Sequence, residues 1–89
     1  MTTETKPLLN FPVDYPIKVV ARRSADLRLR IDAIVAVHAP DFDLSTAVER
    51  DSTHASYVAI TYTIRATGRE QVIALVNALQ ASADVVMLI

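Results

Sequence analysis

The run from Tyr57 to Ala66 alternates large apolar side chains with small or polar ones more strictly than any other segment of the chain. Successive side chains of a β-strand point to opposite faces, so this alternation predicts a strand with one buried face and one open face. Such a strand needs a covering layer on its apolar side only. The residues expected under that layer are Val58, Ile60, Tyr62 and Ile64.

A second strand is predicted over Ile17 to Arg22, where β-branched residues dominate. Its alternation directs Ile17, Val19 and Ala21 toward one face and Lys18, Val20 and Arg22 toward the other. We expect the first of these two sets to share a core with the strand at Tyr57 to Ala66.

A first helix is predicted to follow. Ser24 offers a side-chain oxygen that can cap a helix, and Asp26 would place a negative charge in the first turn. Apolar residues then recur at helical spacing from Leu27 to about His38, and Pro40 ends the helix.

The middle of the chain gives weaker signals. Residues 42–50 predict a strand with Phe42, Leu44 and Val48 on one face, and residues 51–56 have the small polar side chains of a turn.

A second helix is predicted from a capping box in which Thr67 is the N-cap and Glu70 lies three residues later. Asp84 ends this helical segment, and Val85 to Ile89 predicts a short apolar strand. The apolar stripe of the second helix comprises Val72, Leu75, Val76 and Leu79.

In chain order these elements are strand, helix, strand, strand, helix and strand. Because strand–helix–strand crossovers are right-handed, two such units interleave into a four-stranded antiparallel sheet with both helices on one face. The predicted fold is therefore α+β, a ferredoxin-like two-layer sandwich whose central strands are the first and the third. It occupies residues 13–89 as a single domain, since 89 residues leave no room for a second core. Residues 1–12 are expected to form an irregular arm, because closely spaced prolines oppose a regular element.

Composition and charge exclude several classes of function. Nine Lys and Arg residues stand against ten Asp and Glu residues, which argues against nucleic acid or an anionic membrane as the main partner. The absence of cysteine excludes disulfides, thiolate nucleophiles and cysteine-based metal sites. Residues 1–6 carry no apolar stretch, and no segment reaches the roughly 18 apolar residues of a membrane span, so a cytoplasmic location is expected.

We find no residue pattern that favours catalysis, a cofactor or a metal. His38 closes the predicted first helix, and His54 lies in a predicted turn without a neighbouring ligand. Gly68 is the only glycine, so a glycine-rich phosphate loop cannot be built. The chain is therefore predicted not to be an enzyme.

The open sheet face is the expected working surface. Val20, Ala59, Val86 and Leu88 would form a contiguous apolar patch, which on a monomer marks an interaction site. The leading prediction is a non-catalytic regulatory or protein-interaction domain that binds a second copy of itself or a larger enzyme. The interface residues predicted on this face are Lys18, Val20, Tyr57, Ala59, Thr61, Val86 and Leu88.

An alternative prediction is a module that senses a small molecule, such as an amino acid or an organic acid. Arg22, Arg23 and Ser24 join the first strand to the first helix. Exposed amides and partial positive charge at the start of a helix favour a small anion or carboxylate there.

Several short segments, in a fixed order, carry a resemblance to a known family. They are Leu8-Leu9-Asn10-Phe11-Pro12, Tyr15, Lys18-Val19, His38-Ala39-Pro40, Ser52, Tyr57, Ala66-Thr67, Glu70-Gln71-Val72, Leu75 and Val86-Met87. On these residues the chain resembles the YbeD-like family of small bacterial proteins over residues 8–89. The resemblance implies a ferredoxin-like fold similar to that of ACT-type regulatory domains, which bind small molecules, often amino acids, and pair side by side through their sheets. The ligand loop of such domains usually includes glycine, which Arg22-Arg23-Ser24 lacks.

Overall fold

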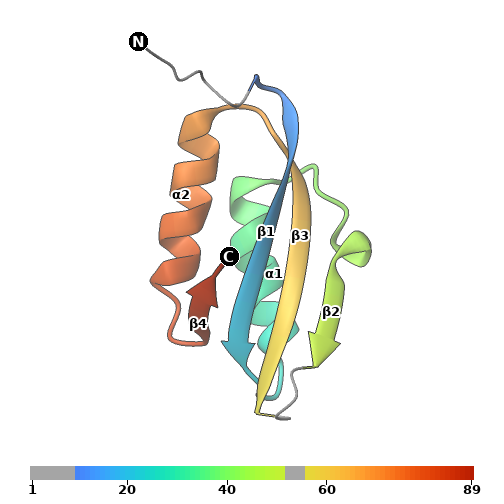
Figure 1. Ribbon diagram of the computed structural model, residues 1–89, viewed down its shortest axis with the longest axis vertical. Helices are drawn as coiled ribbons and strands as arrows, with labels where there is room; N and C mark the ends of the chain where they lie inside the picture. The colour runs from blue at the N-terminus through green and yellow to red at the C-terminus, as the bar shows by residue number, and fades with distance from the viewer. Residues whose placement is uncertain (1–9, 52–55) are drawn as a thin grey trace.

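The computed structural model describes residues 10–51 and 56–89. Its four strands form one antiparallel sheet in the order β2-β3-β1-β4, and Figure 1 shows both helices on the same side of that sheet. This arrangement confirms the predicted α+β, ferredoxin-like sandwich. The elements are β1 (Val13–Arg22), α1 (Leu27–His38), the 3-10 helix η1 (Leu44–Thr46), β2 (Val48–Asp51), β3 (Tyr57–Ala66), α2 (Arg69–Gln80) and β4 (Val85–Leu88).

Two parts of the predictions fall outside the described residues. Residues 1–9 of the predicted arm are one, and residues 52–55 of the predicted turn, His54 among them, are the other. Of the apolar residues that precede β1, Phe11 packs against the core at its edge.

Strands β1 and β3 form the central pair of the sheet, and β1 is longer than predicted. Ten consecutive residue pairs join them, from Val13 opposite Ala66 to Arg22 opposite Tyr57. Strand β1 therefore begins before Ile17 and contains Pro16. Proline is tolerated here because its nitrogen, which carries no hydrogen, points to a side of β1 where no ladder bond is made at this position.

The amide and carbonyl of Lys18 both bond to Ile89, on the β4 side of β1. Backbone groups alternate in direction along a strand, so Pro16 also directs its nitrogen to the β4 side. Strand β4 pairs only with the Val19–Ala21 end of β1, which leaves no ladder bond for Pro16 to lose.

The core lies between the sheet and the helices. All four residues predicted for the inner face of β3 are at most 1% exposed, as is Val19, and Ile17 is 3% exposed. Each helix contributes three buried residues at helical spacing: Leu27, Ile31 and Val35 from α1, and Val72, Leu75 and Leu79 from α2.

Both helices begin later than their predicted caps. Asp26, not Ser24, precedes α1, and it has a left-handed backbone with φ 61°. Aspartate tolerates this conformation better than most residues. The hydroxyl of Ser24 instead accepts a hydrogen bond from Arg30 Nη2 at 2.6 Å.

Helix α2 is preceded by Gly68 rather than by Thr67. The side chain that reaches back over the helix start is Gln71, not Glu70. Its Oε1 accepts from the Thr67 amide at 2.7 Å and from the Thr67 hydroxyl at 3.1 Å. One half of a capping box, the contact from the helix back to the preceding chain, is thus kept one residue further along.

The segment predicted as a weak strand over residues 42–50 divides into η1 and β2. The Asp43 carboxylate accepts from the amide of Ser45 at 3.0 Å and from its hydroxyl at 2.6 Å, which fixes the start of η1 and lowers the pKa of Asp43. Phe42 and Leu44 both pack against the core, so these two share a face as predicted. Val48 does not, because η1 interrupts the alternation, and its side chain is 54% exposed.

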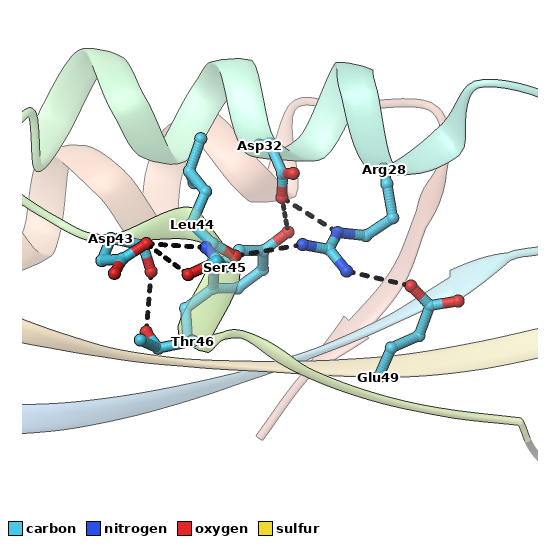
Figure 2. Close-up of polar contacts among 8 residues, drawn as sticks. Arg28, Asp32, Asp43, Leu44, Ser45, Thr46 and Glu49 are labelled. Carbon is cyan, nitrogen blue, oxygen red and sulfur yellow. Dashed lines mark hydrogen bonds and ion pairs between the residues drawn. The ribbon is translucent and has the colours of Figure 1, made fainter.

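A polar cluster ties these pieces together (Figure 2). The buried Tyr62 hydroxyl donates to Asp32 Oδ1 at 2.6 Å, and Arg28 Nε donates to the same oxygen at 3.1 Å. Arg28 also donates to Glu49 Oε1 at 3.1 Å and to the Leu44 carbonyl at 3.3 Å. Burial, and then the bond to Asp32, raise the pKa of Tyr62, and the bond to Asp32 raises the pKa of Arg28. The cluster thereby joins α1 to β3, η1 and β2.

Replacing Tyr62 by phenylalanine tests the contribution of this cluster. We expect Tyr62→Phe to lower the free energy of unfolding by about 1–2 kcal/mol near pH 7, because it removes a hydrogen bond to a charged acceptor that keeps its Arg28 bond. Chemical denaturation measures this change. Tyr15→Phe, which removes a partly buried hydroxyl on β1, is the control, and an equal loss in both variants would contradict the prediction.

The raised pKa of Tyr62 also predicts a dependence on alkaline pH. Its contribution is fully present below about pH 10, where an unfolded tyrosine keeps its proton, and is lost as the pH rises toward the higher pKa of the folded state. Between about pH 8 and pH 11, Tyr62→Phe should therefore lose less stability than the unmodified chain. Denaturation curves at the two pH values test this, and parallel losses in both proteins would contradict it.

Candidate functional site

The face of the sheet opposite the helices is built from five rows of cross-strand neighbours. Residues directly opposite each other in a sheet lie on the same face. Thr61 lies between Lys18 and Val48, and Ala59 lies between Val20 and Arg50. We call this surface the open face. By register its residues are Asp14, Pro16, Lys18, Val20, Arg22, Val48, Arg50, Tyr57, Ala59, Thr61, Thr63, Arg65, Met87 and Ile89.

The centre of the open face is apolar and exposed. Val48, Met87 and Ile89 have 54%, 49% and 69% of their surface exposed, and Val20 and Ala59 between them are partly buried. A hollow of about 630 Å³ lies over this centre. Its lining comprises Lys18, Val20, Val48, Arg50, Asp51, Val58, Ala59 and Thr61.

Of the predicted interface residues, one lies on the other face. Leu88 is opposite Val19 and packs against the core under the helices. The reason is a register shift in β4, where Val20 is opposite Met87 but Ala21 is opposite Val85. This β-bulge inserts one extra residue and reverses the alternation that the sequence implied.

The same bulge explains what the sequence prediction missed in β4. Val85 and Leu88 pack on the core side, so the two residues between them, Val86 and Met87, are both exposed. Val86 therefore keeps its predicted exposure beside β1. Met87 and Ile89 replace Leu88 on the open face.

Strand β2 supplies two further residues of the open face that the sequence prediction did not include. Val48 was predicted to share a face with Phe42 and Leu44, and Arg50 was assigned to neither face. Their places follow from the pairing of β2 with β3, because Thr61 and Ala59 were correctly predicted to face outward.

The predicted anion site around Arg22, Arg23 and Ser24 already has intramolecular partners. Arg23 forms an ion pair with Asp51, and the Arg22 amide donates to the Asp84 carbonyl at 3.0 Å. Ser24 accepts from Arg30.

Two features of that loop bear on anion binding. Arg30 holds Asp84 through two bonds of 2.8 and 3.0 Å, and these lower the pKa of the Asp84 carboxyl. The adjoining hollow of about 210 Å³ is also lined by the carboxylates of Asp26 and Glu49. Binding of a small anion here stays a prediction.

His38, the histidine within the described residues, has a structural position. His38 ends α1, and its carbonyl accepts from Gln71 Nε2 at 2.8 Å. Across residues 10–51 and 56–89, no group of three His, Asp or Glu side chains is placed to hold a metal ion. In the same ranges, neither helix has the length and apolar character needed to cross a membrane.

The fold and the open face define a class: a small two-layer α+β sandwich with helices on one side and an uncovered sheet on the other. The profile of a family described as "Protein of unknown function (DUF493)" matches residues 6–89. The chain belongs to this family, in agreement with its resemblance to the YbeD-like proteins.

Curated bacterial relatives extend over most or all of the chain. The UPF0250 protein NE1487 of Nitrosomonas europaea is 37% identical over the full length of both chains. A UPF0250 protein of Hahella chejuensis is 34% identical over 93% of this chain and 91% of its own. A third, from a Janthinobacterium species, is 36% identical over 86% of this chain and 85% of its own. No solved structure matches the chain.

The bulge in β4 predicts losses of stability of unequal size for two neighbouring residues. Leu88→Ala should lower the free energy of unfolding by about 2 kcal/mol, since it removes apolar surface from the core. Met87→Ala should change it by about 0.5 kcal/mol, because that side chain lies half in solvent. Urea denaturation of the two variants compares them directly. The reverse ranking would show that β4 follows the unshifted register.

The Arg30–Asp84 pair predicts a dependence on acid pH. Because the pKa of Asp84 is lowered in the folded state, its contribution is present above about pH 4 and is lost as the pH falls through the folded value. Asp84→Asn should thus lose less thermal stability than the unmodified chain between about pH 7 and pH 3. Asp41→Asn, at an exposed aspartate after α1, should behave like the unmodified chain. Equal acid sensitivity of all three proteins would contradict the prediction.

Proposed function

We propose that this chain is a non-catalytic protein-interaction domain that acts through the open face of its sheet. The observation that carries the proposal is the exposed apolar centre of that face. Val48, Met87 and Ile89 lie at about half exposure or more around the partly buried Val20 and Ala59. Apolar groups gathered on one surface are stabilised when a partner removes them from water.

The distribution of exposed apolar residues supports the open face, rather than the helical layer, as the binding surface. Leu29, Val37 and Ile73 are also exposed on the helices, but they come from separate turns of α1 and α2. The apolar residues of the open face instead lie on adjacent strands, and several line a single hollow. A regulatory role would follow from control of the protein that is bound there.

Site-specific photo-crosslinking tests the proposal in the cell that makes the protein. A photoreactive phenylalanine derivative at Val48 or Met87 should give discrete protein adducts on irradiation, because both side chains lie on the proposed surface. The same derivative at Val37, an exposed valine on α1, is the matched control. Adducts from Val37 alone, or from none of the three positions, would contradict the proposal.

Charge placed at the apolar centre should abolish the contact. Val20→Asp and Val48→Asp introduce a carboxylate that would have to be buried, and we expect them to remove the adducts and to dissociate any homodimer. Val37→Asp makes the same substitution away from the open face and should leave both unchanged. Circular dichroism confirms that each variant folds. Unchanged adducts in a folded Val48→Asp variant would exclude the open face.

A further inference from the structure

The charges of the open face are distributed unlike those of the whole chain. Among the described residues, this face holds four of the chain's nine basic residues, Lys18, Arg22, Arg50 and Arg65, but Asp14 is its single acidic residue out of ten. Arg65 Nη1 lies 3.3 Å from Asp14 Oδ1, so these two form a pair. The chain has a net charge of −1, but the described residues of this face carry an excess of positive charge.

The three remaining cations surround the apolar centre and have no carboxylate partner among the residues that the structure describes. Lys18 and Arg22 lie on either side of Val20 along β1, and Arg50 is opposite Ala59. Lys18 and Arg50 also line the hollow over this centre. Asp51 lies at the edge of the same hollow, but its carboxylate pairs with Arg23.

On this arrangement we propose that the partner of the open face is a different protein, whose docking surface is apolar at its centre and acidic around it. The inference rests on the proposed function and names the chemistry of the partner. Carboxylates of the partner would meet Lys18, Arg22 and Arg50, while apolar side chains would cover Val20, Val48 and Met87. Complementary charge around an apolar contact sets partner choice and the rate of encounter.

The same charges disfavour a second copy of the chain on this face. A two-fold contact places the same surface on both subunits. Two open faces would therefore bring Lys18, Arg22 and Arg50 against another set of three cations. Among the described residues of the face, the one carboxylate, that of Asp14, is already paired with Arg65 and is not free to neutralise them. Like charges brought together across an interface oppose the association.

The apolar centre favours a protein over a nucleic acid. Proteins that bind single strands without sequence preference use aromatic side chains as platforms for bases. The open face has Tyr57 as its aromatic residue within the described part of the chain, at one end of the β1–β3 ladder. Its exposed centre is aliphatic, with Val48, Met87 and Ile89, and gains little from the polar backbone of a nucleic acid.

Titration of the full chain with defined peptides tests the proposal. The probes are three synthetic peptides in which leucine alternates with glutamate, with serine or with lysine, and backbone amide shifts in nuclear magnetic resonance spectra locate the contact. We expect the leucine–glutamate peptide to shift the amides of Lys18, Val20 and Ala59 and to bind tightest. Its affinity should fall about tenfold when the salt concentration rises from low to high, because exposed charges are screened.

Charge-reversal variants supply the matched comparison. The double variant Lys18→Glu with Arg50→Glu should weaken the leucine–glutamate peptide by about tenfold or more and strengthen the leucine–lysine peptide. Arg69→Glu reverses an exposed charge at the start of α2, away from the open face, and should leave both affinities unchanged. Far-ultraviolet circular dichroism checks that the variants fold.

Other outcomes overturn the inference in distinguishable ways. If the leucine–serine peptide binds the same amides as tightly and the double variant has no effect, the open face docks proteins but does not select acidic ones. If an oligothymidine strand binds these amides more tightly than any peptide, the partner is a nucleic acid. If sedimentation shows self-association that Val48→Asp abolishes, the partner is a second copy. If no probe shifts the open face and crosslinking there also fails, the proposed function is lost as well.

Discussion

The ten-residue ladder between β1 and β3 is the interaction on which the rest of the structure depends. It holds the inner side chains of the two strands at matched positions, so that Ile17 meets Tyr62 and Val19 meets Ile60 under the helices. Both flanking strands are only four residues long, and both pair with the same half of this central ribbon, the half that ends at Arg22 and Tyr57. A change that shifted the ladder by one residue would exchange the buried and the open faces of the sheet.

The polar cluster at Tyr62 sets how the shorter strand β2 joins that ribbon. The hydrogen bond from the Tyr62 hydroxyl to Asp32 connects the ribbon to α1. Arg28 bonds to Asp32, to the Leu44 carbonyl of η1 and to Glu49 of β2, and so extends the connection (Figure 2). The Phe42 ring packs edge-on against the Tyr62 ring, with 5.8 Å between the two ring centroids. The segment after α1 is thus fixed both by the Arg28 hydrogen bonds and by the Phe42 contact. Its pairing with β3 then places Val48 and Arg50 on the open face.

Periodicity predicts this fold because the two central strands and both helices have unbroken patterns. The buried residues of β1 and β3 and most of those of the helices were predicted correctly. A long run of alternation fits only a strand, and a long run of helical spacing fits only a helix. The predictions failed where a local device interrupts the period. The turn of η1 before Val48 and the bulge before Met87 each shift the alternation by an amount that side-chain pattern does not encode. The start of α1 moved because Asp26 takes a left-handed backbone while Ser24 bonds to Arg30 instead of capping the helix. At α2, Gln71 rather than Glu70 bonds back to Thr67.

For the candidate site, sequence was informative about the face and less so about its edges. Lys18, Val20, Ala59 and Thr61 lie on regular strands and were placed correctly. Val48, Arg50, Met87 and Ile89 belong to the short outer strands or follow them, and their positions depend on tertiary pairing. The excess of positive charge on the open face follows in part from the position of Arg50, which the sequence did not predict.

Pro16 has a consequence for how the sheet meets other chains. Strand β1 extends beyond the part that β4 covers, and an uncovered strand edge is a template on which a foreign strand can add. At Pro16 that edge has no N–H to offer, and Asp14, the next residue directed the same way, adds a charge. This end of β1 is therefore protected against edge-to-edge aggregation by its own sequence, without a covering element among residues 10–51 and 56–89.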